Sequence, residues 1–350
     1  MVILGVDAHK ATHTVVAVDG NGRQVGGRTV AATSAGHLEA LRWAAQFEQR
    51  CWALEDCRHV TRRLERELLG VGERVLRVPP KLMAGARRSV RTRGKSDPID
   101  ALAVARAALR EPGLPVAYLD GPAREVRLLV DHREDLVAER TRLQNRLRWH
   151  LHELDPELVI PAGALDRFKT LAALEQRLDA ADGLVRDIAA ELVRRCVELT
   201  RAVNDLERQI VRRVAPLAPA LLALRGCGAL TAAKLVGETA DVRRFTSKSA
   251  FAMYNGTAPV PVSSGNTVRH RLNRGGNRQV NAALHRILVT QMRCFDPARD
   301  YLQRRMSNGN TKTEAIRALR RHLSDTVYQR LVEDSQQAHH RPVTMLEPAA

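Results

Sequence analysis

Two short apolar runs near the start of the chain each end in a carboxylate, and this pattern restricts the fold more than any other feature. Val2 to Val6 leads into Asp7, and Trp52 to Leu54 leads into Glu55. Short apolar runs bounded by polar residues are typical of buried strands. An acid at the end of such a strand is costly unless it meets solvent, a partner or a cation. The pattern predicts a sheet in which two neighbouring strands bring their terminal acids together.

The segments around these runs predict an α/β domain. Asp19-Gly20-Asn21-Gly22, between two apolar runs, is a strong hairpin signal. The further expected elements are strands at 12–18 and 23–30, a helix capped by the hydroxyl of Thr33 or Ser34, a helix at 60–69 and a strand at 74–78. The order β-β-β-α-β-α-β is that of an RNase H/RuvC-like core, a mixed sheet with helices on its faces.

A second pair of acids stands in Lys95-Ser96-Asp97-Pro98-Ile99-Asp100. The i, i+3 spacing places both carboxylates on one helical face, and Pro98 suits the first turn. Alone, the pair is better explained as helix capping, because acids favour the N-terminal turn. With Asp7 and Glu55 already placed, a metal site becomes the better hypothesis. Mg²⁺ prefers carboxylate oxygens, and two such ions can clamp a phosphodiester for in-line attack.

Two histidines, His9 and His59, lie near these acids in the sequence. Lone histidines are more often packed or solvated than catalytic, so neither is assigned a role. The five cysteines are odd in number and lack the paired short spacings of zinc sites. Reduced thiols are therefore expected. No run approaches the roughly 20 apolar residues of a membrane span, and residues 1–6 lack a basic flank and a cleavage site. A soluble, cytoplasmic, nucleoid-associated protein is expected.

Arginine dominates the charge of the chain. Lysine and arginine number 56 against 39 acids, for a formal net charge of +17. Such an excess is expected of a protein that neutralises a polyphosphate partner; a solvated basic surface without a specific ligand is the alternative. Aromatic residues make up only 3%, which favours phosphate contacts over stacking. The residues expected to contact nucleic acid are Arg87, Arg88, Arg91, Arg93, Lys95, Arg269, Arg271, Arg274 and Arg278.

The middle of the chain is helical in pattern. One apolar stripe with alternating spacings of four and three runs from Leu192 to Ile210, and a second runs from Leu136 to Leu154. An intramolecular helical hairpin and a dimerising stalk explain both stripes equally well. The expected domains are an α/β catalytic domain at 1–120, a helical linker and oligomerisation region at 121–218, a mainly helical C-terminal domain at 219–332 and a disordered tail at 333–350.

The C-terminal region contains a polar stretch from Val262 to Thr267, which is expected to be a loop. It includes the neighbouring serines Ser263 and Ser264. On the residues alone, both serines are explained as shaping a glycine-containing turn.

Taken in order, these motifs resemble those of DEDD-type insertion-sequence transposases, which are bridge-RNA-guided serine recombinases with a RuvC-like N-terminal domain. The matching segments are Gly5 to Lys10, Leu54 to Cys57, Lys95 to Ala101, Gly226 to Ala232 and Gly256 to Gly265. Each motif is weak singly, but their order and spacing are specific. Many members follow the glutamate with a small residue, threonine and glycine, whereas Asp56-Cys57-Arg58 follow Glu55 here.

The resemblance implies a transposase that excises and inserts its own element. It implies that Asp7, Glu55, Asp97 and Asp100 hold Mg²⁺, with Mn²⁺ able to replace it, and that Ser264 forms a phosphoserine link to DNA. Ser263 is the competing nucleophile. Implied partners are donor and target DNA, a bridge RNA and further copies of the chain in a dimer or tetramer. The alternatives are a Mg²⁺-dependent RuvC-like endonuclease that uses water, and a nucleic-acid-binding protein without catalysis.

Overall fold

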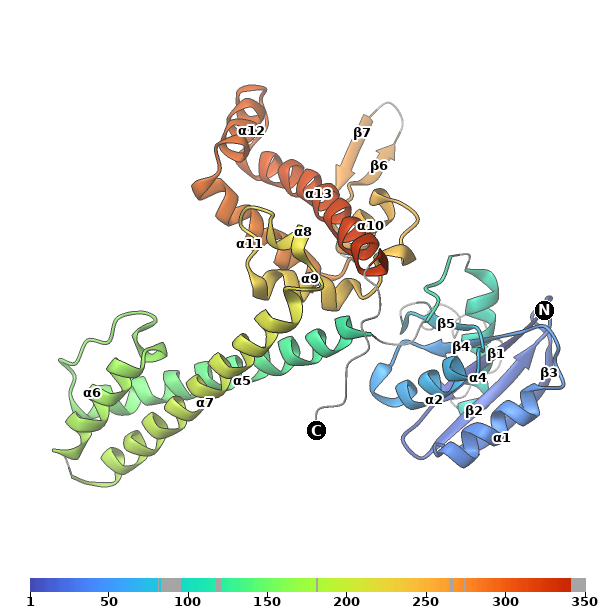
Figure 1. The fold of residues 1–350 in the computed structure, drawn as a ribbon, viewed down its shortest axis with the longest axis horizontal. Coiled ribbons are helices and arrows are strands. Elements are labelled where there is room, and N and C mark those ends of the chain that lie inside the picture. Colours follow the sequence, from blue (N-terminus) through green and yellow to red (C-terminus); the bar gives the residue numbers. More distant parts are fainter. Residues whose placement is uncertain are drawn as a thin grey trace. The chain divides into compact units, whose positions relative to one another are not determined.

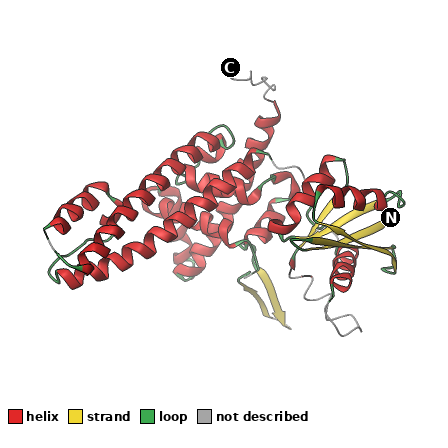
Figure 2. Ribbon diagram, turned by 90° about the horizontal axis from the view of Figure 1, so that it is seen from below, coloured by secondary structure: helices red, strands yellow, loops and turns green. Residues whose placement is uncertain are grey.

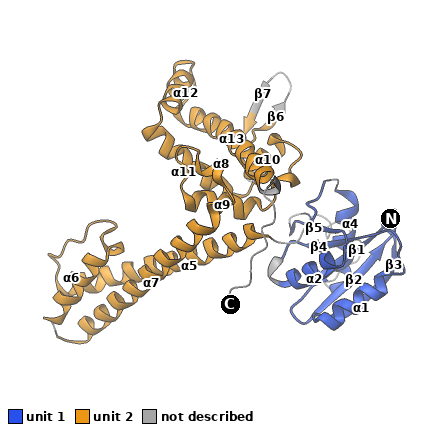
Figure 3. Ribbon diagram, viewed as in Figure 1, with its two compact units in different colours: residues 1–120 blue, residues 121–350 orange. Residues whose placement is uncertain are grey.

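The computed structural model describes residues 1–80, 82, 96–111, 113–117, 121–180, 182–264, 267–273 and 275–340, with the backbone alone at 58, 59, 263, 264, 267–269 and 338–340. The chain forms two compact units, residues 1–120 and 121–350 (Figure 3). None of the helices in the described ranges is long and apolar enough to cross a membrane.

The first unit is built on a five-stranded mixed sheet with the strand order β3-β2-β1-β4-β5. Its elements are β1 (Val2–Ala8), β2 (Thr12–Val18), β3 (Gln24–Ala31), α1 (Ser34–Ala44), β4 (Arg50–Glu55), α2 (Arg58–Gly70), β5 (Val75–Val78) and α4 (Asp97–Arg110). The first three strands are antiparallel, and β4 runs parallel to both β1 and β5. This is the predicted RNase H/RuvC-like arrangement, and the fold class is confirmed. The expected cap of α1 is also present, since Thr33 Oγ1 accepts from the N–H of Gly36 at 3.2 Å.

Helices cover both faces of this sheet (Figure 2). Side chains alternate between the faces along each strand. Leu4 and Val6 of β1 therefore pack in the core that contains residues of α1 and α2. Ile3 packs instead in the core that contains residues of α4. By the same alternation, Asp7 belongs to the face that α4 covers.

Gly5 allows α4 to approach β1 closely. A Cβ at this position would lie 2.3 Å from the carbonyl oxygen of Ala101 and 2.5 Å from the amide nitrogen of Ala105. Both are backbone atoms of α4, so no side chain can move aside to make room. The glycine thus sets the distance between the helix and the strand that carries Asp7.

The second unit is mainly helical (Figure 1). Its elements are α5 (Pro122–Leu154), α6 (Phe168–Asp179), α7 (Leu184–Val214), α8 (Pro219–Leu222), α9 (Ala229–Thr239), α10 (Lys248–Asn255), β6 (Val260–Ser264), β7 (Thr267–Arg271), α11 (Arg278–Cys294), α12 (Asp296–Ser307) and α13 (Lys312–His340), with short 3-10 turns at Ala164–Asp166 and Val242–Arg244.

The two long helices α5 and α7 lie side by side within the chain (Figure 1). Arg133 pairs with Glu207 at 2.9 Å, and Arg195 pairs with Glu139 at 3.0 Å, so the helices run antiparallel. Residues of both predicted stripes are buried in a core shared with α6. The intramolecular hairpin, one of the two interpretations of the stripes, is therefore present, and the stripes do not by themselves require a second chain.

The ends of α5 and α7 continue into the core of the C-terminal helices. Val126 of α5 and Val214 of α7 belong to the same buried cluster as Leu235 of α9, Leu284 of α11 and Val327 of α13. Because this core is continuous, the regions expected as separate domains at 121–218 and 219–332 pack as one compact unit.

Two expectations for the C-terminal region are wrong. Residues 333–340, expected to be disordered, continue helix α13. The buried carboxylate of Asp334 holds them, because it accepts from the N–H groups of Ala220 and Leu221 at 2.7 and 3.2 Å. In the polar stretch expected as a loop, residues 262–264 and 267 instead belong to the antiparallel strands β6 and β7, in which Val262 pairs with Arg269, while residues 265 and 266 lie outside the described residues. The valines and threonine in β6 and β7 suit strands even though the intervening residues are polar.

Candidate active site

Asp7 is the buried acid at the centre of the candidate site. It stands near the end of β1, and only 7% of its surface is exposed. Burial raises the pKa of its carboxyl group above the ordinary value, since desolvation disfavours the charged form. The nearby Asp100 and Asp97 carboxylates raise this pKa further, while His9 opposes them. Asp7 is thus held close to two other acids.

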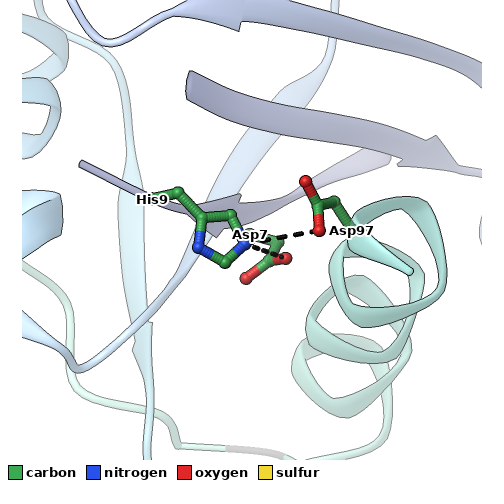
Figure 4. A group of neighbouring side chains, drawn as sticks. All are labelled: Asp7, His9 and Asp97. Atoms are coloured by element: carbon green, nitrogen blue, oxygen red, sulfur yellow. Dashed lines mark hydrogen bonds and ion pairs between the residues drawn. The ribbon is translucent and has the colours of Figure 1, made fainter. Parts of the chain in front are cut away.

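His9 contacts acids from two different elements (Figure 4). Its Nε2 lies 3.1 Å from Oδ2 of Asp7 and 3.4 Å from Oδ1 of Asp97. Ligand atoms of these three residues all lie within 4.8 Å of one another. The sequence alone assigns His9 no role, because the contact with Asp97 depends on how α4 packs against β1. Its position two residues after Asp7 was the only available signal.

Glu55 ends the strand next to Asp7. In the parallel pair of β1 and β4, Val6 lies opposite Leu54. Asp7 and Glu55 are the next residue on each strand and therefore share a face of the sheet. The half-buried thiol of Cys57 lies near both: burial, Glu55, Asp56 and Asp7 together raise its pKa. Cys57 thus borders the acids, although the sequence singled it out only as a departure from the family pattern.

Asp97 and Asp100 occupy the first turn of α4, where Asp97 is half exposed and Asp100 is buried. Both lie close enough to Asp7 to raise the pKa of its carboxyl group, so three of the predicted acids meet where the end of β1 faces α4. Among the described residues, the group of ligand atoms within 4.8 Å of one another contains Asp7, His9 and Asp97, but not Asp100 or Glu55. Carboxylate oxygens are the donors that hard divalent cations prefer. Asp7, whose pKa is raised, would also gain from a nearby positive charge. The donor set therefore fits a divalent cation.

Ser264 belongs to the second unit, whereas the four acids belong to the first. It is the last residue of β6 and pairs with Thr267 across the hairpin, while Ser263 pairs with Val268.

Arg271 and Arg278 are the predicted nucleic-acid contacts whose side chains are described. Arg271 lines a cavity of about 560 Å³, and Arg278 lines an adjoining cavity of about 640 Å³. Arg269 is described only by its backbone position in β7. The remaining predicted contacts lie outside the described residues: Arg87, Arg88, Arg91, Arg93, Lys95 and Arg274.

Known proteins resemble this chain along most of its length. The relative named "Insertion element IS116 uncharacterized 44.8 kDa protein" of Streptomyces clavuligerus is 27% identical, and the match covers 93% of each chain. The "Insertion element IS900 uncharacterized 42 kDa protein" of Mycobacterium paratuberculosis is 26% identical, over 91% of this chain and 92% of the relative. A solved structure, T. thermophilus RuvC in complex with Holliday junction substrate, matches 31% of this chain and 93% of its own at 16% identity, with a TM-score of 0.25.

Two family profiles match the two ends of the chain. The profile described as "Transposase" matches residues 4–156, which include all four acids of the candidate site. The profile described as "Transposase IS116/IS110/IS902 family" matches residues 218–303, which include the β6–β7 hairpin. Transposases of this kind cleave DNA, and the chain belongs to the IS110/IS116 family of insertion-element transposases.

Proposed function

We propose that this transposase excises and inserts its element by cleaving and exchanging DNA strands through a phosphoserine intermediate. Asp7, Glu55, Asp97 and Asp100 act at the scissile phosphate, and Ser264 is the nucleophile. The observation that carries the proposal is the convergence of Asp7 and Asp97 around His9, where acids from a strand and a helix lie within 4.8 Å. Such a group of hard donors is suited to phosphodiester chemistry.

The four carboxylates would hold Mg²⁺, or Mn²⁺ in its place. The bound ion supplies positive charge that stabilises charge developing on the phosphate oxygens. His9 links Asp7 to Asp97 and so holds the end of β1 against the first turn of α4. Gly5 allows the close packing that makes this link short enough. These residues would keep the ligand oxygens in place before a cation arrives.

Ser264 would break the DNA strand while keeping one end attached. Its hydroxyl oxygen attacks phosphorus, a bond from phosphorus to one bridging deoxyribose oxygen breaks, and that oxygen leaves with a proton equivalent to the one the serine loses. The reverse attack by a new deoxyribose hydroxyl releases the serine and joins the exchanged strand. The number of phosphodiester bonds is conserved, so no nucleotide hydrolysis is needed. Arg271 and, on sequence grounds, Arg269 and Arg274 would stabilise the phosphate charge.

Sequence recognition is assigned to an element-encoded bridge RNA that pairs with donor and target DNA. Support comes from the net charge of +17 and from the low aromatic content of 3%, which suit backbone binding better than base stacking. Pairing would read the sequence while the protein holds backbones. Because recombination joins two duplexes, the active form is proposed to be a dimer or tetramer.

The test compares Ser264→Ala with Ser263→Ala as a matched control. Purified full-length variants are incubated with bridge RNA, donor DNA, target DNA and Mg²⁺, and covalent protein–DNA adducts are measured on denaturing gels. Ser264→Ala should lose adducts while keeping nucleic-acid binding, and Ser263→Ala should keep them.

Three other outcomes each overturn part of the proposal. Adducts that persist in Ser264→Ala reject this nucleophile. Cleavage without an adduct in every variant, the wild type included, indicates a nuclease that uses water. Nucleic-acid binding that does not depend on Mg²⁺, together with no cleavage by the wild type, indicates a protein without catalysis.

A further inference from the structure

A cavity of about 560 Å³ in the second unit is lined by several arginines from separate parts of the chain. It lies among the segment after α10, the end of β7 and the helices α12 and α13. Its arginines are Arg271, Arg305, Arg317, Arg320 and Arg321. Only Arg271 was expected to contact nucleic acid, since the α12 and α13 arginines gave no signal beyond a basic helical segment.

Four of these arginines have no carboxylate within ion-pair distance among the residues that the structure describes. Elsewhere in the unit arginines are commonly paired with acids, as in Arg133 with Glu207 and Arg195 with Glu139. Arg321 follows this rule through Asp325. No described carboxylate lies within ion-pair distance of Arg271, Arg305, Arg317 or Arg320. Arg320 instead donates a hydrogen bond from Nη1 to the neutral amide oxygen of Asn281 at 3.1 Å.

One acid, Glu314, also lines the cavity, and its carboxylate is already engaged. Its Oε2 accepts from the N–H and the hydroxyl of Thr311, both at 2.8 Å, at the start of α13. These bonds form a capping box, because the hydroxyl of Thr311 in turn lies 3.3 Å from the N–H of Glu314. The bonds from Thr311, and then the charges of Arg317 and Arg305, lower the pKa of Glu314. Glu314 therefore serves as a helix cap and offsets one positive charge, and the lining keeps an excess of positive charge.

Two further observations on the cavity arginines favour a bound anion. Burial, and then the charge of Arg317, lower the pKa of Arg320. The Nε atom of Arg305 is buried without a hydrogen-bond partner among the described residues. Buried donors in native proteins are almost always satisfied. A bound anion would satisfy such a donor and would offset the repulsion between the arginines.

The cavity continues into a second one of about 640 Å³, with which it shares Gly256, Leu272 and Arg320. The second cavity adds Arg278 and His285 to the row of basic groups. Successive basic hollows of this size suit a chain of phosphates better than one isolated phosphate. The first cavity also includes Arg271, the last residue of the hairpin that carries Ser264.

We propose that Arg305, Arg317 and Arg320, together with Arg271, hold phosphodiester groups of a nucleic-acid strand as it passes the β6–β7 hairpin. The inference rests on the proposed function only in taking this hairpin to carry the nucleophile. Arginine forks bind phosphate oxygens in pairs of hydrogen bonds, so the site would fix the position of the backbone without reading bases. DNA and RNA share this backbone chemistry.

The test measures salt-dependent binding of the full-length protein to single-stranded DNA and RNA oligonucleotides of the same sequence. EDTA is present, so neither cleavage nor a metal site affects the result. The variant Arg305→Gln/Arg317→Gln is compared with Arg304→Gln/Arg330→Gln, which removes the same charge from the same two helices. Arg304 lies over the ring of Tyr301 and Arg330 pairs with Glu333, and neither lines a described cavity.

Each lost phosphate contact should lower the slope of log K against log salt by about 0.7. The cavity variant is therefore expected to lose about 1.4 in slope and to bind at least tenfold more weakly, on the order of 1.4 kcal/mol. The control should change the slope by less than half as much. Arg305→Lys/Arg317→Lys should restore most of the slope, which separates charge from folding.

If the cavity variant binds both DNA and RNA more weakly and with a lower salt slope, a shared backbone site is supported. If it does so for only one of the two polymers, the site is supported and that polymer is its ligand. Equal losses in the cavity variant and the control overturn the proposal, as does an unchanged slope on both polymers. Ser264→Ala should bind like the wild type in this assay. A failure of the nucleophile assignment would therefore leave the phosphate site untouched, and the reverse also holds.

Discussion

The imidazole Nε2 of His9 lies 3.4 Å from Oδ1 of Asp97 and so connects the loop after β1 to the first turn of α4. The same nitrogen lies 3.1 Å from Oδ2 of Asp7. Acids that stand ninety residues apart in the sequence thus meet around one ring (Figure 4). This meeting gives the unit its candidate metal site, and the first two predictions test it.

Asp7→Asn should abolish DNA cleavage and make the folded protein more stable when no divalent cation is present. Burial and then the neighbouring acids raise the pKa of Asp7 in the folded state. Such a group costs stability once it ionises, so the penalty is absent in strong acid and present at neutral pH. Removing the charge should raise the free energy of unfolding by on the order of 1 kcal/mol. Thermal melts in EDTA measure this change.

Added Mg²⁺ tests whether Asp7 binds a cation. It should raise the melting temperature of the wild type but not that of Asp7→Asn, because a ligand that binds only the folded state stabilises it. Glu48→Gln, at an exposed acid of the same unit, should respond as the wild type does. A variant Asp7→Asn that still gains stability from Mg²⁺ would place the cation elsewhere.

Gly5→Ala should destabilise the first unit by about 3 kcal/mol, because the new Cβ would overlap backbone atoms of α4. The shift of α4 should also move Asp97 away from Asp7 and weaken stabilisation by Mg²⁺. The control is Gly70→Ala at the end of α2, where a Cβ would meet nothing within 4 Å. Urea unfolding followed by circular dichroism should find the control within about 1 kcal/mol of the wild type. Equal stability of both variants would show that the close approach is absent.

His13 should make the protein less stable as the pH falls from about 6.5 towards 4. Burial, and then the charge of His37, lower the pKa of His13 to about 4. The two imidazole rings are stacked, with their centroids 5.1 Å apart. In this pH range the unfolded chain takes up a proton at His13 and the folded chain does not. Stability is therefore lost as the pH falls, by up to about 3 kcal/mol.

His13→Gln should flatten this part of the stability profile, measured by urea unfolding at several pH values. His132→Gln, at an exposed histidine, should leave the profile unchanged. A profile that stays equally steep in His13→Gln would assign the acid sensitivity to another group.

Arg77→Met should destabilise the first unit by about 3–5 kcal/mol, because it leaves Glu65 buried without this partner. The two side chains are each 5% exposed and form two hydrogen bonds of 2.7 Å. Arg77→Met/Glu65→Leu should recover much of the loss, since no buried charge remains. Arg195→Met breaks exposed ion pairs with Glu139 and Glu198 and should cost much less, because solvent screens exposed pairs. Chemical unfolding of the wild type and these three variants measures the free energies of unfolding. Similar losses of stability in Arg77→Met and Arg195→Met would contradict the role of burial.

Much of the first unit was predictable from local patterns. The apolar runs, the Asn-Gly turn and the hydroxyl of Thr33 define elements whose signals lie within a few residues, and the structure has them in the expected order. The neighbouring position of the strands that end near Asp7 and Glu55 was also predicted, and β1 does pair with β4. The roles of the site residues in catalysis stay predictions.

Local patterns were less informative in the second unit. The stripes of α5 and α7 allowed an internal hairpin or a second chain, and only the packing of these helices showed the hairpin. The end of α13 gave no sign that Asp334 would reach the N–H groups of Ala220 and Leu221. The polar residues around Ser264 predicted a loop, whereas β6 and β7 form there through pairing between the two strands.

By itself, the sequence determined the order of strands and helices along the first unit and the pairing of the two strands that end near Asp7 and Glu55, because apolar runs and turn residues are local signals. The tertiary structure alone decided that His9 meets Asp97 and that Arg271, Arg305 and Arg320 surround one cavity. Contacts of this second kind depend on how closely two elements can approach, and a single missing Cβ at Gly5 sets that distance for α4. No periodic pattern encodes it.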